Sequence, residues 1–239
     1  MQVRLVTFTP DADLVVASAA RLCYSKKSIT EIYDFLNANP EETQEYVQKL
    51  LDMGHESPFE HVDFTFAIDG VSRAYSHQHV RHRIASYSQK SQRYVKETQF
   101  SYITPPAIEK NAQAKAIYAK LMEQIQTAYN QLLGLGIEGE DARYVLPNAC
   151  ETQIVVTMNA RALFNFFSLR CCSRAQHEIR AVANEMLKLV KEVAPVIFKN
   201  AGPSCVTLGY CPEADKSCGR APTLKELKQA YAQTAATRI

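Results

Sequence analysis

The stretch HVDFTFAIDG, residues 61–70, decides the fold. Its apolar side chains occupy every second position, at Val62, Phe64, Phe66 and Ile68. Successive side chains of a β-strand point to opposite faces, so this alternation predicts a strand with one buried face. Asp69-Gly70 is a turn signal, and we expect the strand to end there.

Outward from this strand, the chain alternates between short strand patterns and longer helical ones. Further strands are predicted at residues 3–8 and 153–158. Helices are predicted at residues 11–22, 41–53, 71–83, 111–133, 159–170 and 175–193. The helix at 71–83 is expected to run straight into a basic segment. The fold class is therefore α+β: a single domain with a small, mostly antiparallel sheet flanked by several helices.

Composition is ordinary for a soluble globular protein, with 46% hydrophobic and 22% charged residues in 239. The net charge is only +2, so any anion site must come from local clustering, and this weakens a general nucleic-acid or membrane-surface role. No apolar run approaches the ~20 residues of a membrane span, and the N-terminus lacks a signal-peptide pattern. We predict a cytoplasmic protein that binds neither nucleic acid nor membranes.

The segment RHRIASYSQKSQRY, residues 81–94, has cations and hydroxyls but no Asp or Glu. Its charges are Arg81, Arg83, Lys90 and Arg93. Guanidinium groups pair bidentately with phosphate, and hydroxyls complete such a site. A solvated helix face usually mixes both charge signs, so this segment predicts an anionic ligand.

Two other segments are rich in polar functions. The loop GHESPFEH, residues 54–61, has two histidines, two carboxylates and a serine, and composition alone favours a capped turn over a binding site. The helix NARALFNFFSLR, residues 159–170, carries Asn159, Arg161, Asn165 and Arg170 beside its apolar positions. These four exceed what helix capping requires, and they suit a ligand rich in carbonyls, ring nitrogens and phosphates.

A metal site at His77, His79 and His82 is disfavoured by geometry. On a helix, His77 and His79 point about 200° apart. Arg81 and Arg83 would also repel a divalent cation.

These blocks together resemble the flavin-dependent thymidylate synthases. Residues 81–91 match the family's RHR-x7-S signature, with Arg81, His82, Arg83 and Ser91 in the signature places. GHESPFEHVDFTF, ARYVLP (residues 142–147) and NARALFNFFSLR resemble its other blocks, in the same order. The resemblance spans about residues 21–190, so we expect a synthase domain at residues 1–200 and a cysteine-containing tail at 201–239.

The resemblance implies an enzyme that converts dUMP to dTMP, with 5,10-methylenetetrahydrofolate as carbon donor, FAD as hydride carrier and NADPH as reductant. It implies a homotetramer whose active sites combine subunits. Carried over by position, the FAD-binding residues are His55, Ser57, Glu60, Arg81, His82, Arg83, Gln89, Asn159, Arg161 and Asn165. The dUMP-binding residues are Gln78, Arg81, Gln89, Lys90, Ser91, Gln92, Arg93, Arg143 and Arg170.

Arg170 is the predicted catalytic residue. Guanidinium stays protonated, so its role is electrostatic: it stabilises negative charge on the uracil ring as C5 becomes nucleophilic. Ser91 is read as a hydrogen-bonding partner of the substrate, because the sequence offers it no base. Ser88 stands where the family often has Asn, and Gln89 where it often has an acid.

The seven cysteines suggest a second hypothesis, since three of them lie in the Gly- and Pro-rich tail. Cys205, Cys211 and Cys218, with Cys171 or Cys172 as a fourth ligand, would make a tetrahedral structural zinc site. The alternative is ordinary thiols, because the spacing lacks a C-x2-C knuckle.

Two rival functions are left open by the residues alone. The segment at 81–96 could bind RNA, with Tyr87 and Tyr94 as stacking platforms. The other rival function is a nucleotide hydrolase whose metal is bound by histidines, and helical geometry disfavours it. A yellow protein with flavin absorbance would exclude both.

Overall fold

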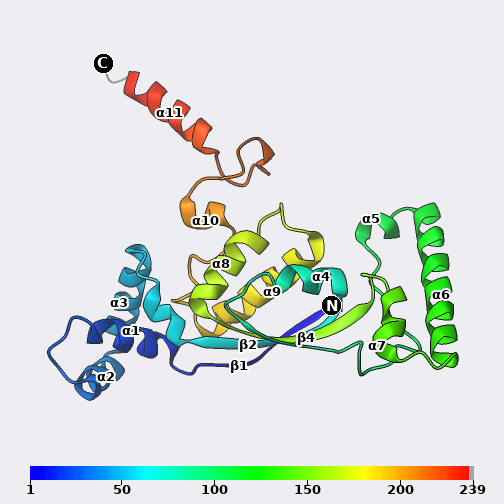
Figure 1. The fold of residues 1–239 in the computed structure, drawn as a ribbon. Helices are drawn as coiled ribbons and strands as arrows, with labels where there is room; N and C mark the ends of the chain where they lie inside the picture. The colour runs from blue at the N-terminus through cyan, green and yellow to red at the C-terminus, as the bar shows by residue number, and fades with distance from the viewer. Residues whose placement is uncertain (237–239) are drawn as a thin grey trace. The chain divides into compact units, whose positions relative to one another are not determined.

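The computed structural model describes residues 1–236 (Figure 1). Its four strands form one antiparallel sheet in the order β1-β2-β4-β3. The strands are β1 Gln2–Phe8, β2 Asp63–Ser72, β3 Ser86–Gln89 and β4 Glu151–Asn159. The α-helices are α1 Ala12–Leu22, α2 Ile29–Ala38, α3 Pro40–Asp52, α4 Arg73–His79, α5 Pro106–Glu109, α6 Ala112–Gly134, α7 Gly139–Ala142, α8 Ala160–Arg170, α9 His177–Val193, α10 Ser204–Leu208 and α11 Leu224–Ala236. Short 3-10 helices are η1 Ser57–His61, η2 Arg143–Val145 and η3 Ala214–Lys216.

The chain forms two compact units that interleave in sequence. Unit 1 comprises Met1–Val3, Ala67–Arg83 and Tyr87–Val156. Unit 2 comprises Arg4–Phe66, Ile84–Ser86 and the chain from Thr157 onward. Every strand gives residues to both units, and the predicted single-domain α+β class with a small antiparallel sheet is confirmed. The homotetramer and the boundary at residue 200 stay predictions, and residues 237–239 of the predicted tail lie outside the described residues.

Strand β2 confirms the deciding pattern but runs beyond its predicted end. Phe64, Phe66 and Ile68 are buried, as the alternation requires. Gly70 does not end the strand. It lies within β2 at φ +68°, where a Cβ would approach the backbone nitrogen of Met1 to 2.9 Å. Glycine here permits a close backbone approach inside the strand, so Asp69-Gly70 does not mark a turn.

Unit 2 has a core of aromatic side chains. The Phe198 ring packs edge-on against Phe64 of β2 and against Phe164 and Phe167 of α8, with centroids 5.2 to 6.1 Å apart. Helices α8 and α9 pack together, and α1 packs against α2 and α3. This core holds α8, and therefore its polar residues, in a fixed place.

Unit 1 has its own apolar cluster beneath α6. Phe100, Met122 and Cys150 are buried there, with Tyr118 and Ile125 of α6 packed against them. The Tyr118 hydroxyl donates to the carbonyl of Ile103 at 2.9 Å. These contacts fix the chain between Phe100 and α6.

Helix predictions hold where a cap and a long apolar stripe agree. Helices α6 and α8 begin after Asn111 and Asn159, whose side chains cap them, and α9 follows Gln176. The helix predicted at 71–83 is wrong in extent: α4 begins after the N-cap Ser72 and ends at His79. Strand β3 and helix α2 were not predicted, although Ser28 and Glu31 form a capping box at the start of α2. Among the residues described, none of the helices could cross a bilayer.

Candidate functional site

In unit 1, the predicted RHR triplet lies on the loop between α4 and β3. The Tyr87 hydroxyl donates to the carbonyls of His79 and His82 at 2.9 and 2.8 Å and closes this loop. Burial raises the pKa of Tyr87 to about 12, so the hydroxyl remains a donor at physiological pH. As a result, His82 is buried while Arg81 and Arg83 are exposed on either side of it.

Strand β3 fixes the segment that follows the triplet. The Gln89 amide nitrogen donates to the hydroxyls of Ser76 and Thr152 at 2.9 and 3.1 Å. The backbone nitrogen of Lys90 donates to Gln153 of β4 at 3.0 Å. With its nitrogen held in this way, Gln89 keeps its amide oxygen for a ligand, which is the function a carboxylate would offer at this position.

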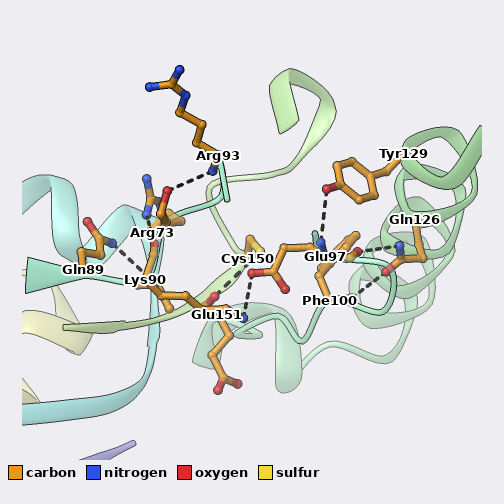
Figure 2. Close-up of polar contacts among 12 residues, drawn as sticks. Arg73, Gln89, Lys90, Arg93, Glu97, Phe100, Gln126, Tyr129, Cys150 and Glu151 are labelled. Atoms are coloured by element: carbon orange, nitrogen blue, oxygen red, sulfur yellow. Dashed lines mark hydrogen bonds and ion pairs between the residues drawn. The ribbon is translucent and has the colours of Figure 1, made fainter. Parts of the chain in front are cut away.

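Two cations of the basic segment have acidic partners that lie outside it in sequence. Lys90 pairs with the buried Glu97, Nζ to Oε1 at 2.8 Å (Figure 2). Arg93 pairs with Glu140. The absence of Asp and Glu within the segment therefore does not leave all four of its cations unpaired in the fold. In the described chain, the structure assigns no carboxylate to Arg81 or Arg83.

Arg73, the first residue of α4, is a member of this cluster that the sequence analysis missed. One of its terminal nitrogens donates to the Lys90 carbonyl at 3.3 Å (Figure 2). Burial is the main factor that lowers the pKa of Arg73, and the nearby Arg143 lowers it further. A lone arginine after an N-cap serine looks like a solvated cation, and only the fold brings Lys90 to it.

The other predicted dUMP residues of unit 1 lie in α4, in the segment that follows β3 and in η2. Gln78 lies in α4 and its amide donates to Ala74 at 3.3 Å. The Ser91 hydroxyl accepts from the Arg93 backbone at 3.2 Å, and Gln92 between them is half-buried. The Arg143 Nε donates to the carbonyl of Glu140 at 3.0 Å, which fixes the guanidinium on η2.

In unit 2, the loop at 54–61 meets helix α8. Arg161 pairs with Glu60 and lies 3.6 Å from Glu56. The Phe59 and Phe164 rings pack beneath this pair, with centroids 5.5 Å apart. The structure thus brings two of the predicted FAD residues, Glu60 and Arg161, into contact with each other.

The remaining unit 2 residues keep largely exposed polar groups. His55 and Ser57 are exposed on the approach to η1, and Asn165 is exposed on α8. The Asn159 side-chain oxygen accepts from the Ala162 backbone at 2.8 Å, so this residue caps α8 as well. Arg170 ends α8, is half-buried, and lines a cavity of about 290 Å³.

Four cysteines line that cavity with Arg170: Cys172, Cys205, Cys211 and Cys218. They are the residues of the zinc hypothesis, yet within residues 1–236 no three metal-ligating side chains come together to hold an ion. A structural zinc needs four donors about 2.0–2.3 Å from one point. The four cysteines line one cavity, but in the described part of the chain they do not converge on one point. The structure therefore gives the zinc hypothesis no binding site.

The predicted residues thus divide between the units. Unit 1 holds the RHR triplet, Gln89 and all the predicted dUMP residues except Arg170. Unit 2 holds Arg170 and the other predicted FAD residues, which are His55, Ser57, Glu60, Asn159, Arg161 and Asn165.

Comparison with known proteins shows what the chain is similar to. The family described as "Thymidylate synthase complementing protein" matches residues 4–196. A flavin-dependent thymidylate synthase from Clostridium tetani is 51% identical, over 95% of this chain and 96% of the relative. Proteins of the same name from Geobacter sulfurreducens and Nitratidesulfovibrio vulgaris are 50% and 48% identical, over 95% and 92% of this chain and 97% and 95% of the relatives.

Proposed function

Because the chain belongs to the family of flavin-dependent thymidylate synthases, we propose how its own residues divide between FAD and dUMP. The enzyme carries out the reductive methylation of dUMP to dTMP. It is a flavoprotein transferase that uses FAD, with NADPH and 5,10-methylenetetrahydrofolate as co-substrates.

The donor set around the RHR triplet fits FAD, which carries a pyrophosphate. Arg81 and Arg83 are exposed cations without a carboxylate partner in the described chain, and hydroxyls of Ser86 and Ser88 follow them. Guanidinium forks match phosphate oxygens bidentately. We assign the pyrophosphate to this loop, with His82 fixing its shape from inside.

In unit 2, the FAD residues are suited to neutral parts of the cofactor. Arg161 already pairs with Glu56 and Glu60, so it brings no net positive charge to a ligand. His55, Ser57 and Asn165 offer exposed donors and acceptors, which suit ring nitrogens and carbonyls. Bound FAD supplies the hydride transfer, and the protein binds and orients it.

For dUMP, we propose that the cluster around Arg73 forms the nucleotide site. Arg143 carries a guanidinium whose Nε is fixed, which leaves its terminal nitrogens for a phosphate. Ser91 and Gln89 add hydroxyl and carbonyl groups for the ribose and base, while Gln78, Lys90, Gln92 and Arg93 complete the site. Arg170 contacts the uracil and stabilises its developing negative charge.

The observation that carries this assignment is the set of guanidinium groups left without a carboxylate among residues 1–236: Arg81, Arg83 and Arg143. The test is an absorbance spectrum of the purified protein, followed by bleaching with NADPH with and without dUMP. Flavin bands that bleach faster when dUMP is present would support one site for both ligands. A colourless protein that ignores added FAD would overturn the assignment, and salt-sensitive RNA binding by that protein would favour the RNA-binding rival.

Arg73 is proposed as a positioning residue for dUMP. Arg73→Ala removes its hydrogen bond to the Lys90 carbonyl, and at 3.3 Å this bond belongs at the weak end for a charged donor, about 1.5 kcal/mol. We expect the KM for dUMP to rise roughly tenfold with little change in kcat. Steady-state kinetics measures this. Arg73→Lys should restore part of the KM, and a fall in kcat alone would contradict the positioning role.

The homotetramer is also a proposal. Large apolar side chains remain exposed near the nucleotide cluster, among them Tyr94 and Tyr144, at 78% and 83%. Such residues are common at the centres of protein interfaces. Sedimentation velocity should give about four times the 26.9 kDa chain mass, and a sedimenting monomer would refute the proposal.

A further inference from the structure

The cavity beside Arg170 contains more thiols than the synthase reaction uses. Two segments of unit 2 form its walls: the turn after α8, which carries Cys172, and the tail, which carries the other three cysteines. The Ser204 hydroxyl donates to the Ser168 carbonyl of α8 at 3.1 Å, and Arg174 lies 3.6 Å from Glu213. The tail is therefore held against the end of α8 and the turn that follows it.

Cys218 has the environment of a reactive thiol. Cys218 is exposed. Its pKa is lowered mainly by hydrogen bonding to the Ser173 side chain and, to a smaller extent, to the backbone of Arg220. Reactive cysteines are accessible and have a stabilised thiolate. Cys171, only one residue before Cys172, is the opposite case: burial raises its pKa to about 12 and keeps it inert.

Cys172 and Cys218 line one cavity of about 290 Å³. A disulfide requires Cα atoms roughly 4.4–6.8 Å apart. A disulfide needs two sulfurs to meet, whereas zinc needs four donors around one point. The cavity therefore suits a pairwise reaction between thiols better than it suits a metal.

We propose that Cys218 and Cys172 form a hydroperoxide-sensitive thiol pair that controls the turn after Arg170. Both cysteines line one cavity with Arg170, and Cys172 follows that arginine by two residues. The expected effect on activity rests on the proposed role of Arg170, which is part of the proposed function. Formation of the disulfide does not depend on that role.

The chemistry requires only a hydroperoxide as oxidant. The Cys218 thiolate attacks the terminal oxygen of the hydroperoxide, and the O–O bond breaks. Cys218 becomes a sulfenic acid, and the leaving alkoxide or hydroxide takes up a proton. The deprotonated Cys172 then attacks the sulfenic sulfur, an S–S bond forms, and hydroxide leaves and is protonated to water. A dithiol reverses the oxidation.

Closing the disulfide would tie the turn directly to the tail and shift the end of α8. A misplacement of about 1 Å costs roughly 10²-fold in rate at a catalytic group. We therefore expect oxidised enzyme to lose dTMP formation by about that factor and to regain it with dithiothreitol.

The test treats purified full-length enzyme, loaded with FAD, with hydrogen peroxide and maps disulfides by mass spectrometry of unreduced peptides. We expect a Cys172–Cys218 linked peptide, together with the activity loss. Cys218→Ser and Cys172→Ser should keep the activity of the untreated enzyme and resist peroxide. Cys23→Ser, which alters an exposed thiol on another segment, should remain as sensitive as the unaltered chain.

Three outcomes would overturn the pair: no linked peptide, a linkage of Cys218 to a different cysteine, or full peroxide sensitivity in Cys218→Ser. If the linked peptide forms but the reduced protein makes no dTMP, the proposed function fails and the thiol pair stands. The mapping and the assay thus separate the two proposals.

Discussion

Arg170→Ala should lower dTMP formation by roughly 10²–10³-fold while FAD remains bound, because the loss of one preorganised electrostatic donor costs about 3–4 kcal/mol in the transition state. Arg170 ends α8 over the aromatic core of unit 2, so its removal leaves that packing intact. Single-turnover dTMP formation measures the chemical step, and the flavin spectrum reports the cofactor.

The matched control for this variant is Arg174→Ala. Arg174 lines the same cavity, is exposed, and lies 3.6 Å from Glu213, so its loss should change the rate little. Arg170→Lys should recover only part of the rate, since an ammonium lacks the planar fork of a guanidinium. Wild-type turnover in Arg170→Ala would refute the electrostatic role.

Arg81→Ala should weaken both FAD and dUMP binding by roughly 10²-fold each, because Arg81 is the only cation assigned to both ligands. Each hydrogen bond from a charged donor contributes about 1.5–3 kcal/mol, and a bidentate phosphate contact uses two. Flavin fluorescence on titration with the apoprotein measures FAD binding, and calorimetry measures dUMP binding.

Arg21→Ala is a suitable control for Arg81→Ala, since Arg21 pairs with Glu42 on the surface at 3.0 Å. It should leave both dissociation constants unchanged. If Arg81→Ala weakened only one ligand, the shared assignment would fail and the other ligand would need a different cation, with Arg83 the first candidate.

The fold was predictable where a local pattern repeats over several turns or a full strand. Strand β2, with its alternating Phe64 and Phe66, and helix α9 follow directly from periodicity. The end of α4 was not predictable, because Val80–Arg83 contain no Gly or Pro and the Tyr87 hydrogen bonds that shape the loop are tertiary. Strand β3 spans only Ser86–Gln89, which is too short for a clear alternation.

The candidate site was predictable as a set of residue types but not as a set of partners. The acid-free segment identified Arg81 and Arg83 correctly as cations without a carboxylate in the described chain. It could not show that Glu97 neutralises Lys90 or that Glu140 neutralises Arg93, because these pairs form only when the chain folds. Arg73 was missed for the same reason.

The interleaving of the two units sets an order for folding during synthesis. Unit 1 is complete in sequence once Val156 has left the ribosome, whereas Phe64 of unit 2 must wait for Phe198. At about 5–20 residues per second this wait lasts roughly 7–27 s. During that time Phe64 lacks the edge-on ring contact that Phe198 supplies. The unit that carries Arg170 is thus the last to become complete in sequence.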